Sequence, residues 1–410
     1  MKIPVRLFLS LSFRPSPIRP IFLRDFSSSS ITTKPLLVLG IESSADDSSA
    51  SIVSSNRQIL SLVTISQHSE NSLYGGIHPL VAQSSHNKNI PLAIEGCLRQ
   101  SGKSMSDIDA IAYTRGPGMR GCLTIGEMAA KGLAAGLGKR LVGVHHMQAH
   151  ALTPLLTEPN PPKFPFLILL VSGGHTQLVL AESQDKFKIL LDTLDSKIGD
   201  VFEKAARQIQ LPTSPTKSPG AILESYASSS PLPPYDLYPL APLPIPLSTN
   251  DTRDKAAFSF AGILSSLQRR IPPDTVLSEN DKKEYSRVFQ VAAVGHLVFK
   301  LKQTIVGLSH VGVGGLGGLV ISGGVASNLY LRQKLQKMLS EIQGEREDDR
   351  MELHYPPISL CTDNAAMIAW TAILRIQNEK GFISDPYDLP IRPKWSLEDL
   401  YDDVESKPQV

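Results

Sequence analysis

Hydrophobic residues occur in short runs that alternate with polar or glycine-rich turns. The runs 35–41 and 166–172 are each followed by a short turn and then by a second apolar run. This pattern predicts a strand, a tight turn and a second strand. Because the two copies lie about 130 residues apart, they predict a duplicated lobe.

Helical patterns lie between these strands. In 121–137, apolar residues such as Leu123, Ile125 and Met128 recur near helical spacing. A further apolar run ends in Gly323-Gly324 and precedes an expected helix that begins near Asn328. Strands that alternate with helices predict an α/β protein with partly parallel sheets. Residues 354–360 are expected to be a strand that leads into a last helix.

The composition is that of an ordinary globular chain, with 410 residues of which 41% are hydrophobic and 20% are charged. That length is sufficient for two domains or two lobes. The longest strongly apolar run, 164–171, has eight residues, far below the roughly 20 that span a bilayer, so no transmembrane helix is predicted. Three scattered cysteines exclude a disulfide framework and a four-cysteine zinc site, and they predict a reducing compartment.

Residues 1–34 differ from the rest, with six Lys or Arg, one Asp and many serines. Arginines and prolines interrupt their apolar stretches, which is typical of an organellar transit peptide; a disordered arm is the alternative. The remaining chain has a net charge of about −3, so a nucleic acid would have to bind a local basic patch. The candidates for such a patch are Lys88, Arg99, Lys103, Arg115 and Arg120.

Breaks in the pattern divide the chain. Residues 211–250 hold 10 of the 31 prolines and are expected to form neither helix nor central strand. Residues 396–410 are acidic and polar and are expected to fray. The resulting prediction is a transit peptide (1–34), lobe I (35–156), lobe II (163–355, with the insert 211–250), a C-terminal helix returning to lobe I (356–385) and a polar tail (386–410).

Candidate metal ligands come from two places. His146 and His150 are spaced i and i+4, which puts both imidazoles on one helical face about 6 Å apart. A packed or surface histidine pair is the alternative, and Gln148 stands where a zinc protease of the HExxH type needs Glu. Asp363, at an expected helix start, is either the N-cap or the third ligand of a His-His-Asp metal site.

Glycine-rich turns at 114–121, 171–177 and 321–328 each follow an apolar strand. Such turns let backbone amides approach an anion or a nucleotide, although single turns are often simple hairpins. None fits the P-loop or Rossmann pattern. Glu42 comes just beyond a strand end, where sheet enzymes carry active groups. Asp195, Asp200 and Glu203 lead into a helix, where they could also serve the helix dipole.

Nine motifs in order carry a resemblance to a known family. The chain resembles the tRNA N6-adenosine threonylcarbamoyltransferases, and most of all their mitochondrial branch. The motifs are distributed over nearly the whole of 36–372. They are residues 40–53, 75–86, 115–134, 144–152, 169–180, 192–207, 258–263, 321–332 and 361–369.

The resemblance implies an α/β, two-lobed actin/Hsp70/sugar-kinase-like fold with a cleft between the lobes. It implies one divalent metal ion, zinc or iron, on His146, His150 and Asp363. The residues implied to bind the substrate L-threonylcarbamoyladenylate are Leu170, Val171, Ser172, Gly173, Gly174, Glu203, Gly220 and Asn328.

Three positions depart from the family pattern. The family commonly has Asp where Glu203 stands, and its Pro-Gly-Gly stretch is reduced here to Pro219-Gly220-Ala221. The Asn that often precedes the first metal histidine is His145, which offers an alternative ligand.

The implied reaction transfers threonylcarbamoyl to N6 of adenosine 37 in tRNAs that read ANN codons, releasing AMP. The implied partners are tRNA, a separate synthase that supplies the adenylate and a second copy of the chain, in the mitochondrial matrix and without a membrane. Glu42 is the candidate proton acceptor.

Three rival functions are a metallopeptidase, a sugar-kinase-like ATPase and a binding scaffold. The His-His-Asp set disfavours a kinase, because kinases hold Mg²⁺ through phosphates and carboxylates.

Overall fold

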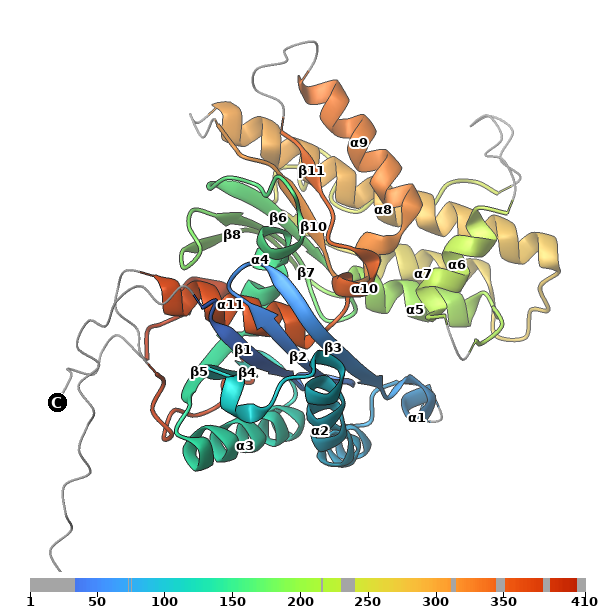
Figure 1. Ribbon diagram of the computed structural model, residues 1–410. Coiled ribbons are helices and arrows are strands. Elements are labelled where there is room, and N and C mark those ends of the chain that lie inside the picture. The colour runs from blue at the N-terminus through green and yellow to red at the C-terminus, as the bar shows by residue number, and fades with distance from the viewer. Residues whose placement is uncertain are drawn as a thin grey trace, which may run out of the picture. The chain divides into compact units, whose positions relative to one another are not determined.

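Two mixed β-sheets form the framework of the computed structural model (Figure 1). Sheet A has the strand order β3-β2-β1-β4-β5, and sheet B has the order β11-β10-β6-β7-β8-β9. The strands of sheet A are β1 (Leu37–Glu42), β2 (Asp47–Ser54), β3 (Gln58–Ser66), β4 (Ala110–Gly116) and β5 (Arg140–His145). Those of sheet B are β6 (Phe166–Val171), β7 (Thr176–Ala181), β8 (Phe187–Thr193), β9 (Ala257–Phe258), β10 (Leu319–Ser322) and β11 (Leu353–His354).

The two sheets repeat one arrangement of strand directions. In sheet A, β1 pairs antiparallel with β2 and parallel with β4, and β5 lies parallel beyond β4. In sheet B, β6 pairs antiparallel with β7 and parallel with β10, and β11 lies parallel beyond β10. The prediction of an α/β fold with partly parallel sheets and duplicated strand-turn-strand units is therefore confirmed. The residues that divide the lobes stay a prediction.

The structure describes residues 34–72, 74, 76–214, 217–229, 240–310, 315–343, 351–378 and 384–403. The expected transit peptide up to residue 33, part of the proline-rich insert and the last residues of the expected tail lie outside them. The described residues from Leu36 onward form a single compact unit.

Helices and short 3-10 turns connect the strands. Before sheet B they are α1 (His68–Ser72), α2 (Pro79–Ser101), η1 (Met105–Asp107), α3 (Arg120–Leu137) and α4 (His146–Thr157). Within and after sheet B they are α5 (Ile198–Gln208), α6 (Pro219–Ala227), α7 (Ala261–Arg270), α8 (Glu279–His310), η3 (Gly324–Ser327), α9 (Leu329–Gln343), α10 (Ile358–Cys361), α11 (Ala365–Gln377) and η4 (Leu397–Asp399).

Alternate residues of the central strands face different helices, as the strand period requires. On β1, Leu39 packs in the cluster of α2 and α3, whereas Val38 packs in the cluster of α11. Figure 1 shows these helices on opposite faces of sheet A. A Cβ on Gly40 would lie 2.3 Å from the carbonyl oxygen of Ala365, so the backbone of α11 lies directly on β1.

Strand β6 divides its side chains in the same way. Leu169 faces the large core that includes residues of α5, α8 and α9, and Leu170 faces a core that includes Met147 and Leu152 of α4. Because α4 also contributes Ala149 to the core of sheet A, this helix packs against both sheets. The histidine pair of the sequence therefore lies on the helix that joins them.

Helix α8 is long and apolar enough to cross a membrane, judged by length and composition alone. The core helix of a water-soluble domain passes the same test, and Phe289, Ala293 and Leu297 of α8 belong to the core of sheet B. Polar residues such as Arg287 and Lys300 interrupt its apolar residues, which is why no long apolar run marks it in the sequence. The three cysteines are buried and unpaired.

Two local predictions were wrong. The expected strand 354–360 is mostly not a strand, because Pro356 and Pro357 lack amide donors and end β11, after which Ile358 begins α10. The proline-rich insert was expected to contain no helix, yet it contains α6. Pro219 is tolerated at the first position of that helix, and the Ser218 hydroxyl accepts a hydrogen bond from the Ala221 amide (3.3 Å).

The expected fraying of the C-terminal tail is also wrong for the residues described. Within 396–403, the side chains of Leu397 and Leu400 are buried. Both leucines belong to the core that α4 shares with sheet B. The prediction took the acidic residues of the segment to be solvated. In the structure, Asp403 pairs with Arg115 and Asp402 pairs with Arg392.

Candidate active site

The histidines of the expected metal site lie in the first turns of α4, directly after β5. His145 caps this helix, since its Nδ1 accepts hydrogen bonds from the amides of Met147 (3.1 Å) and Gln148 (3.3 Å). Its Nε2 donates to the backbone carbonyl of Trp395 (3.2 Å). Both ring nitrogens of His145 are therefore engaged, which removes His145 as the alternative metal ligand.

The other two histidines turn toward Asp363. Nε2 of His150 lies 3.0 Å, and Nε2 of His146 lies 3.3 Å, from Oδ1 of Asp363. The two rings meet edge to face with centroids 4.7 Å apart. The side chain of His146 is 6% exposed and that of His150 is 5% exposed, whereas that of Asp363 is 25% exposed. The carboxylate is thus the side of the cluster that solvent can reach.

Asp363 is not the cap of the helix that follows it. Asn364 caps α11, because its Oδ1 accepts a hydrogen bond from the Met367 amide (3.1 Å). The capping interpretation of Asp363 is therefore wrong by one residue. Its carboxylate is left free to face the histidines.

Glu42 lies behind His146. Its Oε2 is 3.1 Å from Nδ1 of His146 and accepts a hydrogen bond from the Thr114 hydroxyl (2.5 Å), while Oε1 accepts from the Ser44 amide (2.5 Å). The side chain is fully buried. A carboxylate that holds the far nitrogen of a histidine fixes its ring orientation and its tautomer, as partners of metal-bound histidines commonly do.

The charges of this cluster shift one another. Burial lowers the pKa of His146, but the negative charges of Asp363 and Glu42 outweigh it and raise that pKa to about 10. Burial raises the pKa of Asp363, but His146 and His150 hold it well below its ordinary value. Burial likewise raises the pKa of Glu42, and His146 brings it below its ordinary value. The acids are therefore ionised, and a cation bound here would displace a proton from His146.

The donor set fits a divalent metal ion. Each of His146, His150 and Asp363 offers one ligand atom, and these atoms all lie within 4.8 Å of one another. Two imidazoles and a carboxylate suit zinc or iron(II), and three protein ligands leave further coordination positions for a substrate. Gln148 does not join them, because its amide donates to the Gln184 carbonyl (2.9 Å) and the Tyr401 hydroxyl (3.2 Å).

The turn after β6 is the first part of the expected adenylate site. The Ser172 hydroxyl accepts hydrogen bonds from the amides of Gly174 (3.2 Å) and His175 (3.0 Å), and the Ser172 amide donates to the His175 carbonyl (2.8 Å). Gly173 and Gly174 are exposed. Leu170 and Val171 are buried in the two cores of sheet B, so only their backbone could face a ligand.

This turn lies beside the metal-ligand cluster. His175 is close enough that, after burial, the charges of His146 and His150 contribute to lowering its pKa to about 3. His175 is therefore a neutral imidazole next to the cluster. In the sequence, its position at the end of the SGGH turn was the signal for a role of His175 at this site.

Two glycines let the backbone close around the same turn. A Cβ on Gly199 would lie 2.6 Å from the Gly173 nitrogen, and one on Gly323 would lie 2.4 Å from the Val171 carbonyl oxygen. Gly323 also has a φ of 99°, which only glycine adopts readily. The turn after β6 is thus packed between the start of α5 and the end of β10.

The remaining expected contacts come from neighbouring elements. Glu203 is partly buried on α5, and Gly220, in the first turn of α6, lies beside Phe202 of α5, where an added Cβ would be 3.6 Å from the Phe202 Cβ. Asp195 is occupied elsewhere, because it accepts hydrogen bonds from the Phe260 amide (2.8 Å) and the Ser259 hydroxyl (2.6 Å). Asp200 pairs with a lysine one turn along α5.

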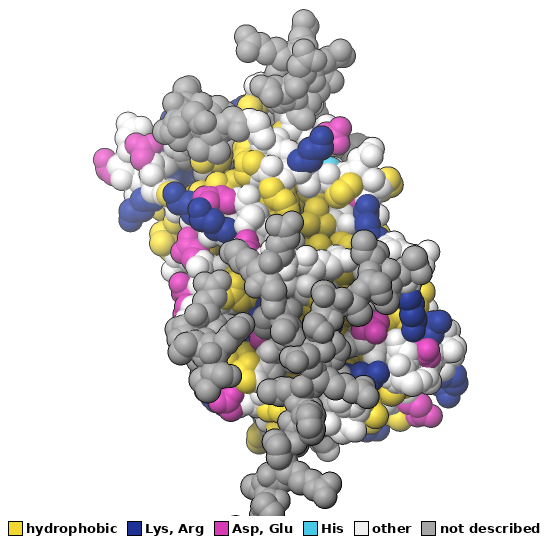
Figure 2. Space-filling view, turned by 60° about the vertical axis from the view of Figure 1, so that its left-hand side comes forward, with side chains coloured by type: hydrophobic (Ala, Val, Ile, Leu, Met, Phe, Trp, Pro, Cys, Tyr) yellow, Lys and Arg dark blue, Asp and Glu magenta, His cyan; other side chains and the backbone are white. Residues whose placement is uncertain are grey.

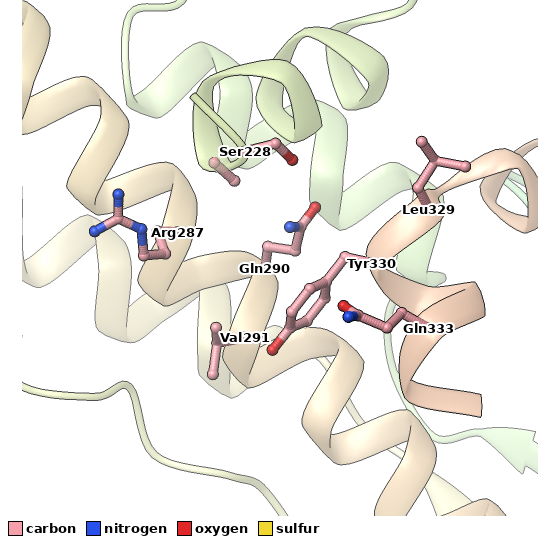
Figure 3. A pocket seen from close by; sticks show the side chains of 8 residues that line it. Ser228, Arg287, Gln290, Val291, Leu329, Tyr330 and Gln333 are labelled. Carbon is pink, nitrogen blue, oxygen red and sulfur yellow. The ribbon is translucent and has the colours of Figure 1, made fainter. Parts of the chain in front are cut away.

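Asn328 lies at the start of α9 beside a cavity of about 330 Å³. Its Oδ1 accepts from the Leu331 amide (2.8 Å), and its Nδ2 donates to Oε1 of Gln290 (3.0 Å). Figure 3 shows Gln290 and Val291 of α8 opposite Tyr330 of α9 in this cavity. The residues lining it are Ala227, Ser228, Arg287, Gln290, Val291, Leu329, Tyr330 and Gln333.

Sequence reasoning missed two polar groups at this cavity. Arg287 is 97% buried, and its Nε and Nη2 have no hydrogen-bond partner among the described residues. Glu224 accepts a hydrogen bond from the Leu329 amide (2.6 Å) and so joins α6 to the start of α9. The position of Glu224, one helical turn after Gly220, was the signal available in the sequence.

The basic residues expected to contact nucleic acid are not equivalent. Arg115 is buried and forms a salt bridge with Asp403, so its prediction as a phosphate contact is wrong. The other four are exposed: Lys88, Arg99, Lys103 and Arg120. On the face seen in Figure 2, described Lys and Arg side chains are interspersed with Asp and Glu rather than gathered in one area.

Comparison with solved structures finds distant likenesses. Component A of the (R)-2-hydroxyglutaryl-CoA dehydratase of Acidaminococcus fermentans matches with a TM-score of 0.45 and 13% identity, over 83% of this chain and 98% of that one. A ROK hexokinase of Thermus thermophilus matches with a TM-score of 0.39 and 14% identity, over 83% and 98%. At these TM-scores the likenesses carry no argument about function.

Comparison with known sequences identifies relatives that are much more similar than these solved structures. The mitochondrial tRNA N6-adenosine threonylcarbamoyltransferase of Schizosaccharomyces pombe is 38% identical over 92% of this chain and 90% of its own length. The enzyme of that name from Chromobacterium violaceum is 36% identical over 89% of this chain and 99% of its own. The family model for tRNA N6-adenosine threonylcarbamoyltransferase matches residues 58–370. This chain therefore belongs to the tRNA N6-adenosine threonylcarbamoyltransferase family.

Proposed function

We propose that this chain transfers threonylcarbamoyl from L-threonylcarbamoyladenylate to N6 of adenosine 37 in mitochondrial tRNAs that read ANN codons, forming t6A and AMP. Membership of a transferase family supports the reaction. The observation that carries the proposal is the convergence of His146, His150 and Asp363 beside the glycine turn after β6.

His146, His150 and Asp363 would hold one zinc or iron ion. Such an ion is a Lewis acid, which would polarise the acyl group of a bound adenylate. The buried carboxylate of Glu42 is bonded to the far nitrogen of His146. This supports a positioning role for Glu42, in place of the proton-acceptor role considered from the sequence, because no substrate can reach a fully buried carboxylate.

The adenylate would extend from the exposed turn Ser172–Gly174 toward Asn328. The cavity beside Asn328 would receive the adenine ring, since its volume of about 330 Å³ lies at the lower end of ligand pockets. Arg287 and Gln290 offer polar groups there. Glu203 and Gly220, on α5 and α6, would complete the contacts with the nucleoside.

The target amine constrains the mechanism. The exocyclic nitrogen of adenine is a poor nucleophile, because its lone pair is delocalised into the ring. The enzyme must therefore activate the acyl carbon and stabilise the developing oxyanion. The target base lies in a tRNA loop, where it can be splayed out at modest cost.

The resemblance and the relatives support the proposed location and partners. The Schizosaccharomyces pombe relative is named as mitochondrial, and the transit-like composition of residues 1–34 supports import into the matrix. A reporter that carries only residues 1–34 should enter mitochondria; a reporter that stays in the cytosol would overturn this part. We place a separate synthase upstream as the source of the adenylate, and a homodimer as the working form, away from membranes.

The direct test of function is transfer in a purified system. The chain from residue 35 onward, loaded with zinc or iron(II), is incubated with unmodified tRNA and L-threonylcarbamoyladenylate, and nucleosides are measured by mass spectrometry. The proposal predicts one t6A per tRNA that reads an ANN codon, and no product when ATP, threonine and bicarbonate replace the adenylate. Product from these three precursors would instead make the chain a complete synthase, and hydrolysis of ATP without tRNA would favour the kinase-like function.

A further inference from the structure

The segment Ser384–Asp403 follows the edge of sheet A. The Asp385 amide donates to the Leu141 carbonyl (2.8 Å), and the Leu141 amide donates to the Ser384 hydroxyl (3.0 Å). The buried carboxylate of Asp385 pairs with Arg375 of α11 (3.0 Å) and accepts from the Gly143 amide (2.6 Å). The segment is therefore bonded to β5, the strand that leads into α4.

The segment then crosses the turn between β4 and α3. The Arg392 amide donates to the Arg115 carbonyl (2.8 Å), and the Gly118 amide donates to the Pro393 carbonyl (3.1 Å). A Cβ on Gly116 would lie 1.9 Å from the Arg392 carbonyl oxygen. The backbone of the segment thus lies directly on the end of β4.

Trp395 comes next and contacts the cap of α4. Its ring lies 4.6 Å from the ring of His145, centroid to centroid, and its carbonyl accepts the hydrogen bond from His145 Nε2. The guanidinium carbons of Arg115 and Arg392 each lie 4.9 Å from the Trp395 ring centroid. An indole that is 9% exposed and contacted by two guanidinium groups has little freedom to move away from His145.

The last described residues reach sheet B. Leu397 and Leu400 pack in the core that contains Met147 and Leu170. The Glu398 carboxylate accepts a hydrogen bond from the Ile189 amide of β8 (2.9 Å). One segment therefore contacts sheet A, the start of α4 and sheet B in sequence.

We propose that this segment is a clasp for the metal centre, in which Trp395 holds the His145 ring and thereby sets the position of His146. The amides of Met147 and Gln148 donate hydrogen bonds to Nδ1 of His145. In the chain, His146 lies between His145 and these two residues. A shift of the His145 ring therefore moves the backbone of the first metal ligand. The inference rests on the proposed function only in taking His146, His150 and Asp363 as metal ligands.

The structure separates the clasp from an ordinary helix cap. An asparagine at position 145 can still cap α4 through its side-chain oxygen, but it has no ring to pack against Trp395 and no Nε2 donor for its carbonyl. His145→Asn therefore keeps the cap and removes the clasp. Trp395→Ala removes the ring contact from the other side, and Trp395→Phe retains an aromatic ring there.

The test is a double-mutant cycle on the affinity for zinc, measured by chelator competition on the chain from residue 35 onward. His145→Asn and Trp395→Ala should each weaken zinc binding about tenfold, the lower end of the loss that follows removal of a group outside the ligand set that orients a metal ligand. The double variant should be about as weak as His145→Asn alone, because His145→Asn already removes the ring contact that Trp395→Ala removes. Trp395→Phe should recover most of the affinity.

Two further readouts separate positioning from loss of fold. Excess zinc should restore threonylcarbamoyl transfer in His145→Asn and Trp395→Ala, because all three ligands remain. Lys394→Ala, next to Trp395 but exposed, should leave zinc affinity unchanged. Where Trp395→Ala lowers the unfolding temperature too far for measurement, His145→Asn carries the test alone.

The outcomes distinguish the two proposals. Wild-type zinc binding together with unchanged affinity in a folded His145→Asn variant overturns the clasp and leaves the metal site standing. Strictly additive losses in the cycle also overturn it, because His145 and Trp395 would then act separately. A wild-type chain that binds neither zinc nor iron(II) overturns the metal site itself.

Discussion

Sheets A and B have the same arrangement of strand directions, but different kinds of residue follow the carboxyl ends of their parallel strands. In sheet A, Glu42 ends β1 and His146 follows β5, and both side chains are buried in one hydrogen-bonded network. In sheet B, Ser172 follows β6 and Gly323 follows β10, and the backbone itself forms the surface. One half presents fixed side chains, whereas the other presents a turn and a cavity.

The difference shows how a duplicated fold divides one task. The carboxyl ends of parallel strands meet at one edge of a sheet, where ligands commonly bind. Sheet A uses that edge to fix imidazoles and carboxylates, which suits a cation. Sheet B uses it for small residues that leave room, which suits a nucleotide. Function therefore depends on which residues follow the strands and not on the strand order.

The largest expected effect comes from the histidines of the sheet A edge. His146→Ala and His150→Ala should each remove bound metal and lower transfer by roughly a thousandfold, because loss of a Lewis acid costs several kcal/mol of transition-state stabilisation. The fold should persist, since the cores of both sheets exclude the cluster. Metal analysis, transfer assays and circular dichroism check this, and a fully active His150→Ala protein would contradict it.

The glycines of the sheet B edge should give the opposite signature. Gly199→Ala and Gly323→Ala would press a Cβ on the turn after β6, and overpacking of this kind costs about 1–3 kcal/mol. The KM for the adenylate should rise about tenfold or more, while metal content stays at the wild-type level. Gly132→Ala on α3 is the control, because nothing lies within 4 Å of its Cβ position. Metal loss in the Gly323→Ala protein would contradict the claim that the sheet B edge serves the adenylate and not the metal.

Glu42→Gln should have an intermediate effect on sheet A. The amide can still bond to His146 but lacks the charge, so metal affinity should fall about tenfold. Excess metal should restore transfer if Glu42 only positions His146. Transfer that stays low at saturating metal would instead make Glu42 the proton acceptor. Glu182→Gln, at an exposed carboxylate paired with a lysine, is the matched control.

The smallest effect concerns tRNA on the sheet A side. Arg120→Ala and Lys88→Ala should each weaken tRNA binding several-fold and reduce the salt slope by about one, as expected for a lost phosphate contact. Lys302→Ala on the sheet B side, at an exposed lysine paired with Glu341, should change neither. The check is a binding titration between 50 and 200 mM salt, and a flat salt response of the wild-type chain would contradict electrostatic binding.

Much of this arrangement could be predicted from the sequence, because its signals are local. Alternating apolar runs marked the four central strands β1, β2, β6 and β7, and the i, i+4 spacing placed His146 and His150 on one helical face. For Asp363 the sequence alone left the N-cap and the metal ligand as alternatives, and only the order of the motifs favoured the ligand, since Asp363 lies more than 200 residues from the histidines in the chain.

Other features depend on contacts that no local pattern encodes. The acidic and polar residues from 396 onward suggested a frayed end, but in the folded chain Asp402 pairs with Arg392 and Asp403 pairs with Arg115. Glu42 looked accessible in the sequence because it ends a strand, yet its carboxylate is buried and bonded to Thr114 and His146. The choice of Asn364 over its neighbour Asp363 as helix cap depends on backbone geometry that a one-residue difference in sequence cannot show.

The most direct measurement of the central claim is the metal content of Asp363→Ala, determined together with transfer of threonylcarbamoyl to tRNA. Asp363 is the anionic member of the ligand set, so its removal leaves two imidazoles, which cannot hold a metal that must also bind substrate. We predict that the purified variant folds, contains little or no metal and, like the histidine variants, transfers threonylcarbamoyl roughly a thousandfold more slowly. Undiminished metal and full activity in the Asp363→Ala protein would contradict the metal centre and the function built on it.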